Sequence, residues 1–403
     1  MVIKYFLLFT LFAICKFIGT IVPRKKNRII FGAWLGNKYD DNPKALYEYI
    51  LTNKKGIDAL WLTNNKKIFD ELSSKNIPVR MTNSIKGMWR CLTSRYLCYC
   101  VEPNDIGLYL FTLLNGCIFV NLWHGIPLKR VGNDNKFSEK YRKEYLSQYT
   151  TGAIKWIEKC DSIKKSILKN HIYHIAPGEE MGKIYEGVFG VESKYVLKLG
   201  QARNDYFFTS HNNPVIDRFK GYKRIVYMPT HRKEGRDSID LNRIFNLETI
   251  NNFCKEHNMV FLVKKHFYHR MEPTIPDGNY SNIYDLTAYP IKTQELVEAA
   301  DILITDYSGV YIDFLLLDRP MLFYAYDLDD YMSSDRDFYL PYDENHIPGK
   351  ICTSQEHMLT ELGIICSGKD SSGDIRLKMK NYYYSPVAQK AVSETQINTI
   401  LSL

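Results

Sequence analysis

The chain has 403 residues, of which 45% are hydrophobic and 24% charged, a composition that excludes a disordered, collagenous or low-complexity protein. The formal net charge of +8 suits an anionic lipid surface or a phosphorylated substrate. Without helix-turn-helix or zinc-finger spacing, it does not indicate nucleic acid. Nine cysteines without a CxxC pair support neither a disulfide framework nor a zinc site and are typical of a reducing cytoplasm.

The amino-terminal segment is apolar from Tyr5 to Val22, apart from Lys16, and the basic run Pro23–Arg28 follows it. Its uncharged part is shorter than the roughly 20 apolar residues that cross a bilayer. The basic run favours the cytoplasmic side and adds attraction to anionic lipids. We expect residues 1–27 to be a membrane-contact segment. An interfacial anchor, a short span and a buried amphipathic helix remain open.

Past this segment, short apolar runs alternate with longer mixed stretches, a pattern that indicates strands separated by helices. The predicted strands are Ile29–Gly32, Ala59–Leu62, Tyr96–Val101, Ile118–Trp123, Tyr173–Ala176, Tyr195–Leu199, Arg224–Met228, Val260–Val263, Ile302–Thr305 and Met321–Tyr324. The predicted helices include Pro43–Lys54, Thr151–Asn170, Asp240–His257 and Gln294–Ala300. Buried strands that alternate with helices predict an α/β fold with parallel sheets covered on both faces.

The length favours two domains over one oversized core. The polar stretch 209–223 has the composition of a linker and separates a first Rossmann-like domain, 28–208, from a second, 224–375. The final part, 376–403, contains a predicted terminal helix over Leu377–Leu403. We expect this helix to pack back on the first domain.

A histidine follows one of the predicted strands, in the sequence Trp123-His124-Gly125. Ligand sites of open α/β sheets gather at the carboxyl ends of strands, and an imidazole can accept a proton near neutral pH. Gly125 allows close approach of a ligand, and Pro127 and two cations follow. The alternative is a structural histidine that bonds to local backbone.

A second histidine, His266, ends the strand Val260–Val263 together with Lys264. Both side chains can donate hydrogen bonds to phosphoryl oxygens, which predicts a phosphate site. The alternative is a solvated charged loop.

The segment from Asp306 to Asp313 combines a strand end with the dipeptide Ser308-Gly309, which can open a helix. A helix amino terminus presents N–H groups that hold phosphate without a metal. We expect Ser308 to add a hydroxyl and Asp313 to accept hydrogen bonds from ribose or polyol hydroxyls.

Two arginines follow other predicted strands. Arg203 lies in Gly200–Asp205, and Arg232 lies close behind Thr230 in Tyr227–Arg232. A guanidinium can bind two phosphate oxygens at once, so both are candidate phosphate ligands. Either could instead be the partner of a surface ion pair.

Five motifs occur in order along the chain: WHG-x-PLK-x-x-G at Trp123–Gly132, G-x-x-RND at Gly200–Asp205, PT-x-R at Pro229–Arg232, K-x-H at Lys264–His266 and DYS-x-V-x-x-D at Asp306–Asp313. Together they resemble the CDP-glycerol glycerophosphotransferase family, whose members make teichoic acids and related polymers. The resemblance covers about residues 28–331. It implies a GT-B arrangement, in which two Rossmann-like domains face a cleft.

The resemblance also implies a reaction. An acceptor hydroxyl attacks the β-phosphorus of a CDP-polyol, most simply CDP-glycerol, and CMP is released. His124 would be the general base and His266 would stabilise the phosphoryl charge. Other motif residues would hold the donor and the acceptor: Gly125, Pro127, Arg203, Thr230, Arg232, Lys264, Ser308, Gly309 and Asp313. No metal or cofactor is implied.

Several positions depart from the family pattern, notably Ile126, His231, Phe267 and Gly309. Ile126 and Gly309 have no hydroxyl group, so two possible hydrogen-bond donors are absent. CDP-ribitol or another nucleotide-linked substrate is therefore an open alternative to CDP-glycerol. The departures also leave open a capsule polymer in place of a teichoic acid, and a primase in place of a polymerase. A non-catalytic relative that binds a polyanionic polymer and a sugar-nucleotide transferase are further alternatives. The expected partners are a CDP-polyol, a polymer or lipid-linked acceptor and the anionic cytoplasmic face of the cell membrane.

Overall fold

The structure is a computed structural model. It describes residues 10, 14, 17–107, 116–135, 142–144, 146–148, 150–152, 155, 158, 162, 172–209, 211–230, 239–265, 275, 278–334 and 337–403. The chain forms two compact units. Unit 1 comprises Met1–His124, Phe137–Asp205 and Tyr384–Leu403, and unit 2 comprises Gly125–Lys136 and Tyr206–Tyr383.

Unit 1 is built on a seven-stranded parallel sheet with the strand order β3-β2-β1-β4-β5-β6-β7. The strands are β1 (Lys25–Phe31), β2 (Asp58–Thr63), β3 (Val79–Met81), β4 (Ser94–Tyr99), β5 (Ile118–Asn121), β6 (Ile172–Ala176) and β7 (Val196–Lys198). This order is that of a doubly wound Rossmann sheet, whose switch point lies between β1 and β4. Ligands of such sheets bind outside the carboxyl ends of the strands, which is where His124 follows β5.

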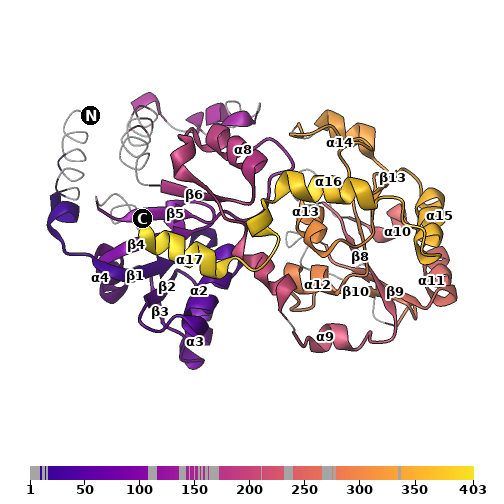
Figure 1. The fold of residues 1–403 in the computed structure, drawn as a ribbon, viewed down its shortest axis with the longest axis horizontal. Coiled ribbons are helices and arrows are strands. Elements are labelled where there is room, and N and C mark those ends of the chain that lie inside the picture. Colours follow the sequence, from indigo (N-terminus) through magenta and orange to yellow (C-terminus); the bar gives the residue numbers. More distant parts are fainter. Residues whose placement is uncertain are drawn as a thin grey trace. The chain divides into compact units, whose positions relative to one another are not determined.

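Helices cover both faces of this sheet (Figure 1). They are α2 (Asp41–Asn53), α3 (Lys66–Ser74), α4 (Ile85–Leu92), α8 (Glu179–Phe189) and α17 (Ser393–Ser402). Successive side chains of a strand point to opposite faces. Ile29 and Phe31 of β1 therefore pack in the core that includes α2 and α17, whereas Ile30 packs with Cys91 of α4.

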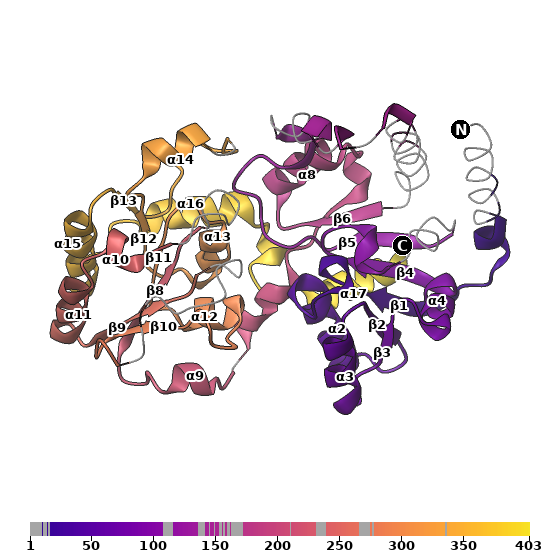
Figure 2. The same ribbon diagram turned by 180° about the vertical axis from the view of Figure 1, so that it is seen from behind.

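Unit 2 contains a six-stranded parallel sheet with the order β10-β9-β8-β11-β12-β13 (Figure 2). Its strands are β8 (Lys223–Met228), β9 (Met259–Val263), β10 (Ile283–Asp285), β11 (Ile302–Thr305), β12 (Met321–Tyr324) and β13 (Lys350–Cys352). Its helices are α9 (Pro214–Asp217), α10 (Leu241–Ile244), α11 (Leu247–Glu256), α12 (Thr293–Ala299), α13 (Val310–Phe314), α14 (Leu328–Ser334), α15 (Gln355–Cys366) and α16 (Gly373–Tyr383). The switch point lies between β8 and β11, which are hydrogen-bonded neighbours.

Every strand predicted from the sequence is present, and the predicted α/β class with two parallel sheets is confirmed. Three strands were not predicted: β3, β10 and β13. Each has three residues and lies at an edge of its sheet. Edge strands need no continuous apolar run, because one side of each strand has no neighbour in the sheet.

Two predicted helices are each divided in the structure. The helix predicted over Asp240–His257 is α10 followed by α11, because the Asn246 side chain accepts a hydrogen bond from Thr249 N and starts α11 anew. The helix predicted over Leu377–Leu403 is the end of α16 followed by α17, with Pro386 between them. The helix predicted over Thr151–Asn170 lies largely outside the described residues.

At the amino terminus, the described residues 17–21 are helical. Among the helices that the structure describes, none is both long and apolar enough to cross a membrane. Strand β1 begins at Lys25, so the last residues of the predicted 1–27 segment are part of the first sheet. The predicted linker 209–223 contains α9 and the start of β8.

Candidate active site

The turn after β5 carries His124. Trp123, the residue before it, has a φ of 55°, a left-handed conformation that is unusual for a residue other than glycine. The Asn121 side chain stabilises this turn, because its Oδ1 accepts a hydrogen bond from Trp123 N at 2.9 Å. The strand end therefore holds His124 through a strained and locally bonded turn.

Asn42, in the first turn of α2, ties this turn to the rest of unit 1. Its Nδ2 lies 3.1 Å from Leu122 O, 3.0 Å from Trp123 O and 3.5 Å from His124 O. Its Oδ1 accepts a hydrogen bond from Arg203 N at 3.0 Å. One buried amide thus connects α2, the His124 turn and the G-x-x-RND motif. Asn42 belongs to none of the five sequence motifs.

Arg203 forms an ion pair with Asp41, and Arg203 Nη1 lies 3.0 Å from Asp41 Oδ1. Both side chains are largely buried. Burial raises the pKa of Asp41, although the Arg203 guanidinium opposes this shift. Asp41 also has a φ of 67°. The pair therefore holds the Arg203 guanidinium within unit 1. The predicted contact of Arg203 with the donor pyrophosphate stays a prediction.

The imidazole of His124 lies among aromatic rings. It stacks on Trp123, with ring centroids 4.4 Å apart, and lies 5.4 Å from the Trp34 ring centroid. Burial, followed by the positive charge of Arg203, lowers the pKa of His124 to about 4. His124 is therefore neutral at physiological pH, the state that a general base requires.

Backbone strain gathers near this site. Trp34, Leu35, Asp41 and Trp123 have positive φ values, and they follow β1, open α2 or follow β5. The Leu35 turn is held by Asp105, whose Oδ1 accepts a hydrogen bond from Leu35 N at 2.7 Å. Strained backbone of this kind persists only where the surroundings over-determine it, and it is commonly found at functional sites.

Unit 2 has polar chemistry at its own switch point. Asp306, at the end of β11, is fully buried, and its Oδ1 accepts hydrogen bonds from Thr230 N at 2.8 Å and Tyr307 N at 2.6 Å. The predicted residue Thr230 follows β8. Asp306 therefore joins the carboxyl ends of the two central strands.

The predicted Ser308-Gly309 turn precedes α13, as the sequence indicated. The Ser308 hydroxyl accepts a hydrogen bond from Val310 N at 3.3 Å. A Cβ added at Gly309 would lie 3.0 Å from Ile126 O, so this turn packs closely on the segment that follows His124. Asp313 is buried and accepts a hydrogen bond from Gln294 Nε2 at 3.2 Å.

The segment after His124 belongs to unit 2, beginning at Gly125. Pro127 is buried, whereas a Cβ added at Gly125 would meet no atom within 4 Å. Lys129 pairs with Phe338 in an antiparallel bridge, and its buried ammonium donates to the Tyr331 hydroxyl. The WHG motif thus spans the point where the chain passes from one unit to the other.

Lys264 has structural partners in unit 2. Its ammonium donates to Leu286 O at 3.1 Å and Tyr289 O at 3.0 Å, and so holds the loop after β10. Its predicted contact with phosphate stays a prediction. The predicted site residues His266 and Arg232 lie outside the described residues.

The structure therefore brings together two groups of predicted residues. His124 and Arg203 lie in unit 1, and Thr230, Ser308 and Gly309 lie near Asp306 in unit 2. Within the described part of the chain, no three His, Cys, Asp or Glu side chains are grouped so that they could hold a metal ion.

Two Rossmann-type sheets with polar side chains at their switch points define the class, an α/β protein with ligand chemistry at the carboxyl ends of its strands. A family model described as CDP-glycerol:poly(glycerophosphate) glycerophosphotransferase matches residues 14–402. The chain belongs to this family and is a transferase, which confirms the resemblance noted from the motifs.

Curated relatives match along most of the chain. A teichoic acid poly(glycerol phosphate) polymerase of Bacillus spizizenii is 28% identical over 376 residues, with 88% of this chain and 87% of the relative covered. A teichoic acid glycerol-phosphate transferase of Staphylococcus aureus is 29% identical, with 84% and 83% covered. A teichoic acid ribitol-phosphate primase of Bacillus spizizenii is 24% identical, with 83% and 82% covered.

Among solved structures, a variant of the wall teichoic acid polymerase TagF has a TM-score of 0.71 at 23% identity, with 94% of this chain and 89% of that chain covered. A UDP-GlcNAc 2-epimerase of Neisseria meningitidis has a TM-score of 0.53 at 11% identity, with 93% and 100% covered. These similarities establish the fold that the chain shares with both enzymes.

Proposed function

We propose that the protein transfers glycerol phosphate from CDP-glycerol to a hydroxyl of a growing or lipid-linked polymer and releases CMP. The observation that carries the proposal is His124, a neutral imidazole fixed at the carboxyl end of β5 by Asn42. Family membership and the similarity to glycerol-phosphate enzymes over more than four-fifths of the chain support the choice of donor.

In the proposed mechanism, His124 takes the proton of the attacking hydroxyl while the oxygen forms a bond to the β-phosphorus. The bond from that phosphorus to the bridging pyrophosphate oxygen breaks, and CMP leaves. Thr230, Ser308 and Gly309 would hold the CDP group through backbone and hydroxyl groups, and their position at the ends of β8 and β11 supports this role. His266 would stabilise the phosphoryl charge. Positioning and electrostatic stabilisation are the main demands of phosphoryl transfer.

The proposal includes a GT-B arrangement, in which the units supply the acceptor and donor sites respectively. Gly125 and Pro127 would contact substrate beside His124. Arg203 would act within the His124 site, because its guanidinium is paired with Asp41 there. Arg232, Lys264 and Asp313 would support the donor site.

The test is CMP release by the purified chain supplied with CDP-glycerol or CDP-ribitol. We expect CDP-glycerol to be preferred. His124→Ala should lose about 10²–10⁴ in turnover, the usual contribution of a positioned general base. The matched control is His357→Ala, which removes an exposed histidine of α15.

Near-normal turnover of His124→Ala would contradict the general-base role. A strong preference for CDP-ribitol would instead place the chain with the ribitol-phosphate enzymes, to one of which it is 24% identical. Absence of CMP release with every CDP-polyol would support the polyanion-binding alternative.

We also propose that the protein acts at the cytoplasmic face of the cell membrane, held there by its apolar amino-terminal segment and the basic residues behind it. Because β1 begins at Lys25, the appropriate truncation removes residues 1–22. The truncated chain should be released from membranes, and undiminished sedimentation with membranes in high salt would contradict this location.

A further inference from the structure

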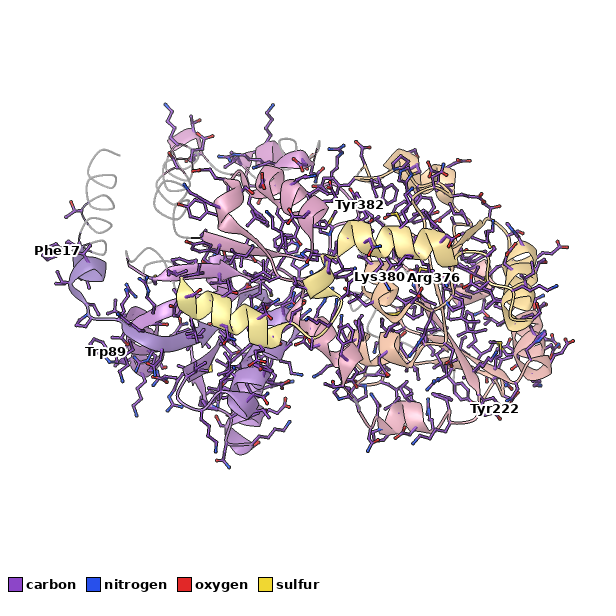
Figure 3. The ribbon with its side chains drawn as sticks, viewed as in Figure 1. Phe17, Trp89, Tyr222, Arg376, Lys380 and Tyr382 are labelled. Atoms are coloured by element: carbon purple, nitrogen blue, oxygen red, sulfur yellow. The ribbon has the colours of Figure 1, made fainter. Side chains whose placement is uncertain are left out.

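Helix α4 turns an apolar face outward. Ile85 is 83% exposed and Trp89 is 59% exposed, and their spacing of four places both on one side of the helix. The opposite side, with Gly87 and Cys91, is buried against the sheet. Figure 3 shows the Trp89 side chain pointing away from the ribbon of unit 1. An apolar stripe in this position has no role in the core of the unit.

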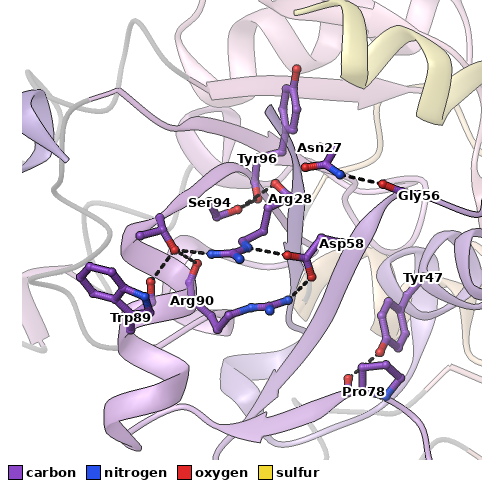
Figure 4. Close-up of polar contacts among 11 residues, drawn as sticks. Asn27, Arg28, Tyr47, Gly56, Asp58, Pro78, Trp89, Arg90, Ser94 and Tyr96 are labelled. Carbon is purple, nitrogen blue, oxygen red and sulfur yellow. Dashed lines mark hydrogen bonds and ion pairs between the residues drawn. The ribbon is translucent and has the colours of Figure 1, made fainter. Parts of the chain in front are cut away.

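The orientation of α4 is fixed by its buried side. A Cβ added at Gly87 would lie 2.5 Å from Met81 O, so the helix packs too closely to rotate. Asp58 accepts hydrogen bonds from both Arg90 of α4 and Arg28 of β1, the latter at 2.8 Å (Figure 4). Ile85 and Trp89 are therefore exposed because the packing and hydrogen bonds of α4 fix its orientation.

The amino-terminal segment is joined to the end of α4. Arg24 Nη1 lies 2.8 Å from Leu92 O and 2.9 Å from Ser94 O. Just before it, Phe17 is 65% exposed and Ile21 is 61% exposed. We call these four exposed side chains the apolar patch; it consists of Phe17, Ile21, Ile85 and Trp89.

Cations accompany the apolar patch. Lys25, Lys26 and Lys86 are exposed. The sequence contains no Asp or Glu in residues 1–39 or 83–101. Asp58, which lies beside α4, is paired with Arg28 and Arg90. An aromatic and an aliphatic side chain beside exposed lysines match the headgroup region of an anionic bilayer.

We propose that α4 is a second membrane-contact element, which inserts Ile85 and Trp89 at the headgroup–acyl boundary of an anionic bilayer beside the amino-terminal segment. This inference deepens the membrane location in the proposed function, and it is independent of the reaction. In this proposal, the exposed side of α4 is the part of unit 1 that contacts the lipid.

The test uses the full chain and sedimentation with vesicles of phosphatidylcholine, with or without phosphatidylglycerol. The double variant Ile85→Ser, Trp89→Ser should lose about tenfold or more in partitioning to anionic vesicles, because it removes two apolar groups from the interface. The matched control is Tyr222→Ser, Leu377→Ser, which removes exposed apolar side chains of unit 2. It should bind vesicles as the unaltered chain does.

A second measurement does not depend on serine substitutions. Brominated lipids should quench part of the tryptophan fluorescence of the unaltered chain, and Trp89→Phe should remove that part while vesicle binding is retained. Partitioning of the double variant equal to that of the unaltered chain, or quenching unchanged by Trp89→Phe, would overturn the inference.

Another occupant of the patch would also be detected. If the double variant bound vesicles normally but changed a dimer into a monomer in light scattering, the patch would be an interface between copies, and the inference would be wrong. Vesicle binding is measured without CDP-glycerol or acceptor. An inactive protein that binds through α4 would therefore contradict the proposed reaction and leave this inference intact.

Discussion

Arg203 lowers the pKa of His124, the proposed base, and this effect can be measured in the pH dependence of turnover. The pKa of His124 is lowered to about 4, first by burial and then by Arg203. Because the base must be neutral, the acid limb of turnover should lie near that pKa. Arg203→Gln removes the positive charge, so the His124 pKa should rise and turnover near pH 5 should fall relative to turnover at pH 7.5.

The pH profile of CMP release, measured under saturating donor, checks this prediction. Arg243→Gln is the control, because the exposed Arg243 of α10 lies in unit 2 outside the five motifs. An acid limb that stays in place in Arg203→Gln would show that Arg203 does not tune the histidine.

Asn42 is expected to act as a positioning residue. Asn42→Ala removes the donor to Leu122 O and Trp123 O and the acceptor for Arg203 N. Small displacements of a catalytic group cost up to about 10² in rate, so turnover should fall strongly while the donor KM changes little. Unpaired buried groups should also lower the free energy of unfolding by about 1–3 kcal/mol.

Asn27→Ala is the matched control for Asn42. It removes an exposed bond, from Asn27 Nδ2 to Gly56 O at 2.7 Å, on the same sheet. Turnover should be unaffected in this variant. If Asn42→Ala lost stability but kept its turnover, the role of Asn42 would be structural alone.

The sequence predicted His124 and its turn, because a histidine directly after an apolar run can be read locally. It did not predict Asn42 or Asp41, since each partner lies far along the chain: Arg203 is 161 residues from Asn42. Locally, Asp41-Asn42-Pro43 resembles an ordinary helix start. The carbonyl partners of Lys264 could not be predicted locally either, because they belong to a loop more than 20 residues away.

At the scale of elements, helix α13 and its preceding turn can be tested through Gly309. A methyl group added there would lie 3.0 Å from Ile126 O. Gly309→Ala should push the two segments apart, at a cost of about 1–3 kcal/mol that is typical of overpacking. Affinity for CDP-glycerol should fall about tenfold, which calorimetry can measure.

Gly363→Ala provides the comparison, because a Cβ there would meet no atom within 4 Å and the residue lies inside α15. This change should leave donor affinity intact and stabilise the helix by about 0.5–1 kcal/mol. Equal donor affinity in both variants would remove Gly309 from the donor site.

Buried central strands could be predicted from the sequence, whereas three short edge strands could not. Central strands such as β4 and β8 end in four consecutive buried apolar residues and were identified with small shifts of their ends. The edge strands β3 and β13 carry mixed residues, Val-Arg-Met and Lys-Ile-Cys, which no run of apolar residues marks. The division between α10 and α11 depends on the capping side chain of Asn246 inside an otherwise helical pattern.

At the scale of the whole molecule, the carboxyl-terminal helix α17 is part of unit 1 (Figure 1). Asp205 holds its start, because the carboxylate accepts hydrogen bonds from Val392 N at 2.7 Å and Ser393 N at 2.9 Å. Asp205→Ala should cost about 1–2 kcal/mol, as loss of a helix cap does. Amide protection should fall in residues 393–402 and in unit 1.

Hydrogen exchange of the folded protein measures this effect. Ser354→Ala removes a cap of similar kind from α15 in unit 2, where Ser354 Oγ accepts a hydrogen bond from His357 N. Its effect should be confined to unit 2. Loss of protection spread equally over both units in Asp205→Ala would contradict an independent role of α17 in unit 1.

The chain leaves unit 1 after His124, returns to it for Phe137–Asp205, and returns again for its final segment, Tyr384–Leu403. During synthesis, domains generally fold as their residues emerge, starting from the amino terminus. Unit 1 is begun first but lacks α17 until the ribosome has made the whole of unit 2. A chain interrupted between β7 and residue 384 would therefore carry His124 on a complete sheet whose core lacks Ile397 and Ile400 of α17. We expect such a chain to have a less stable unit 1 than the full protein.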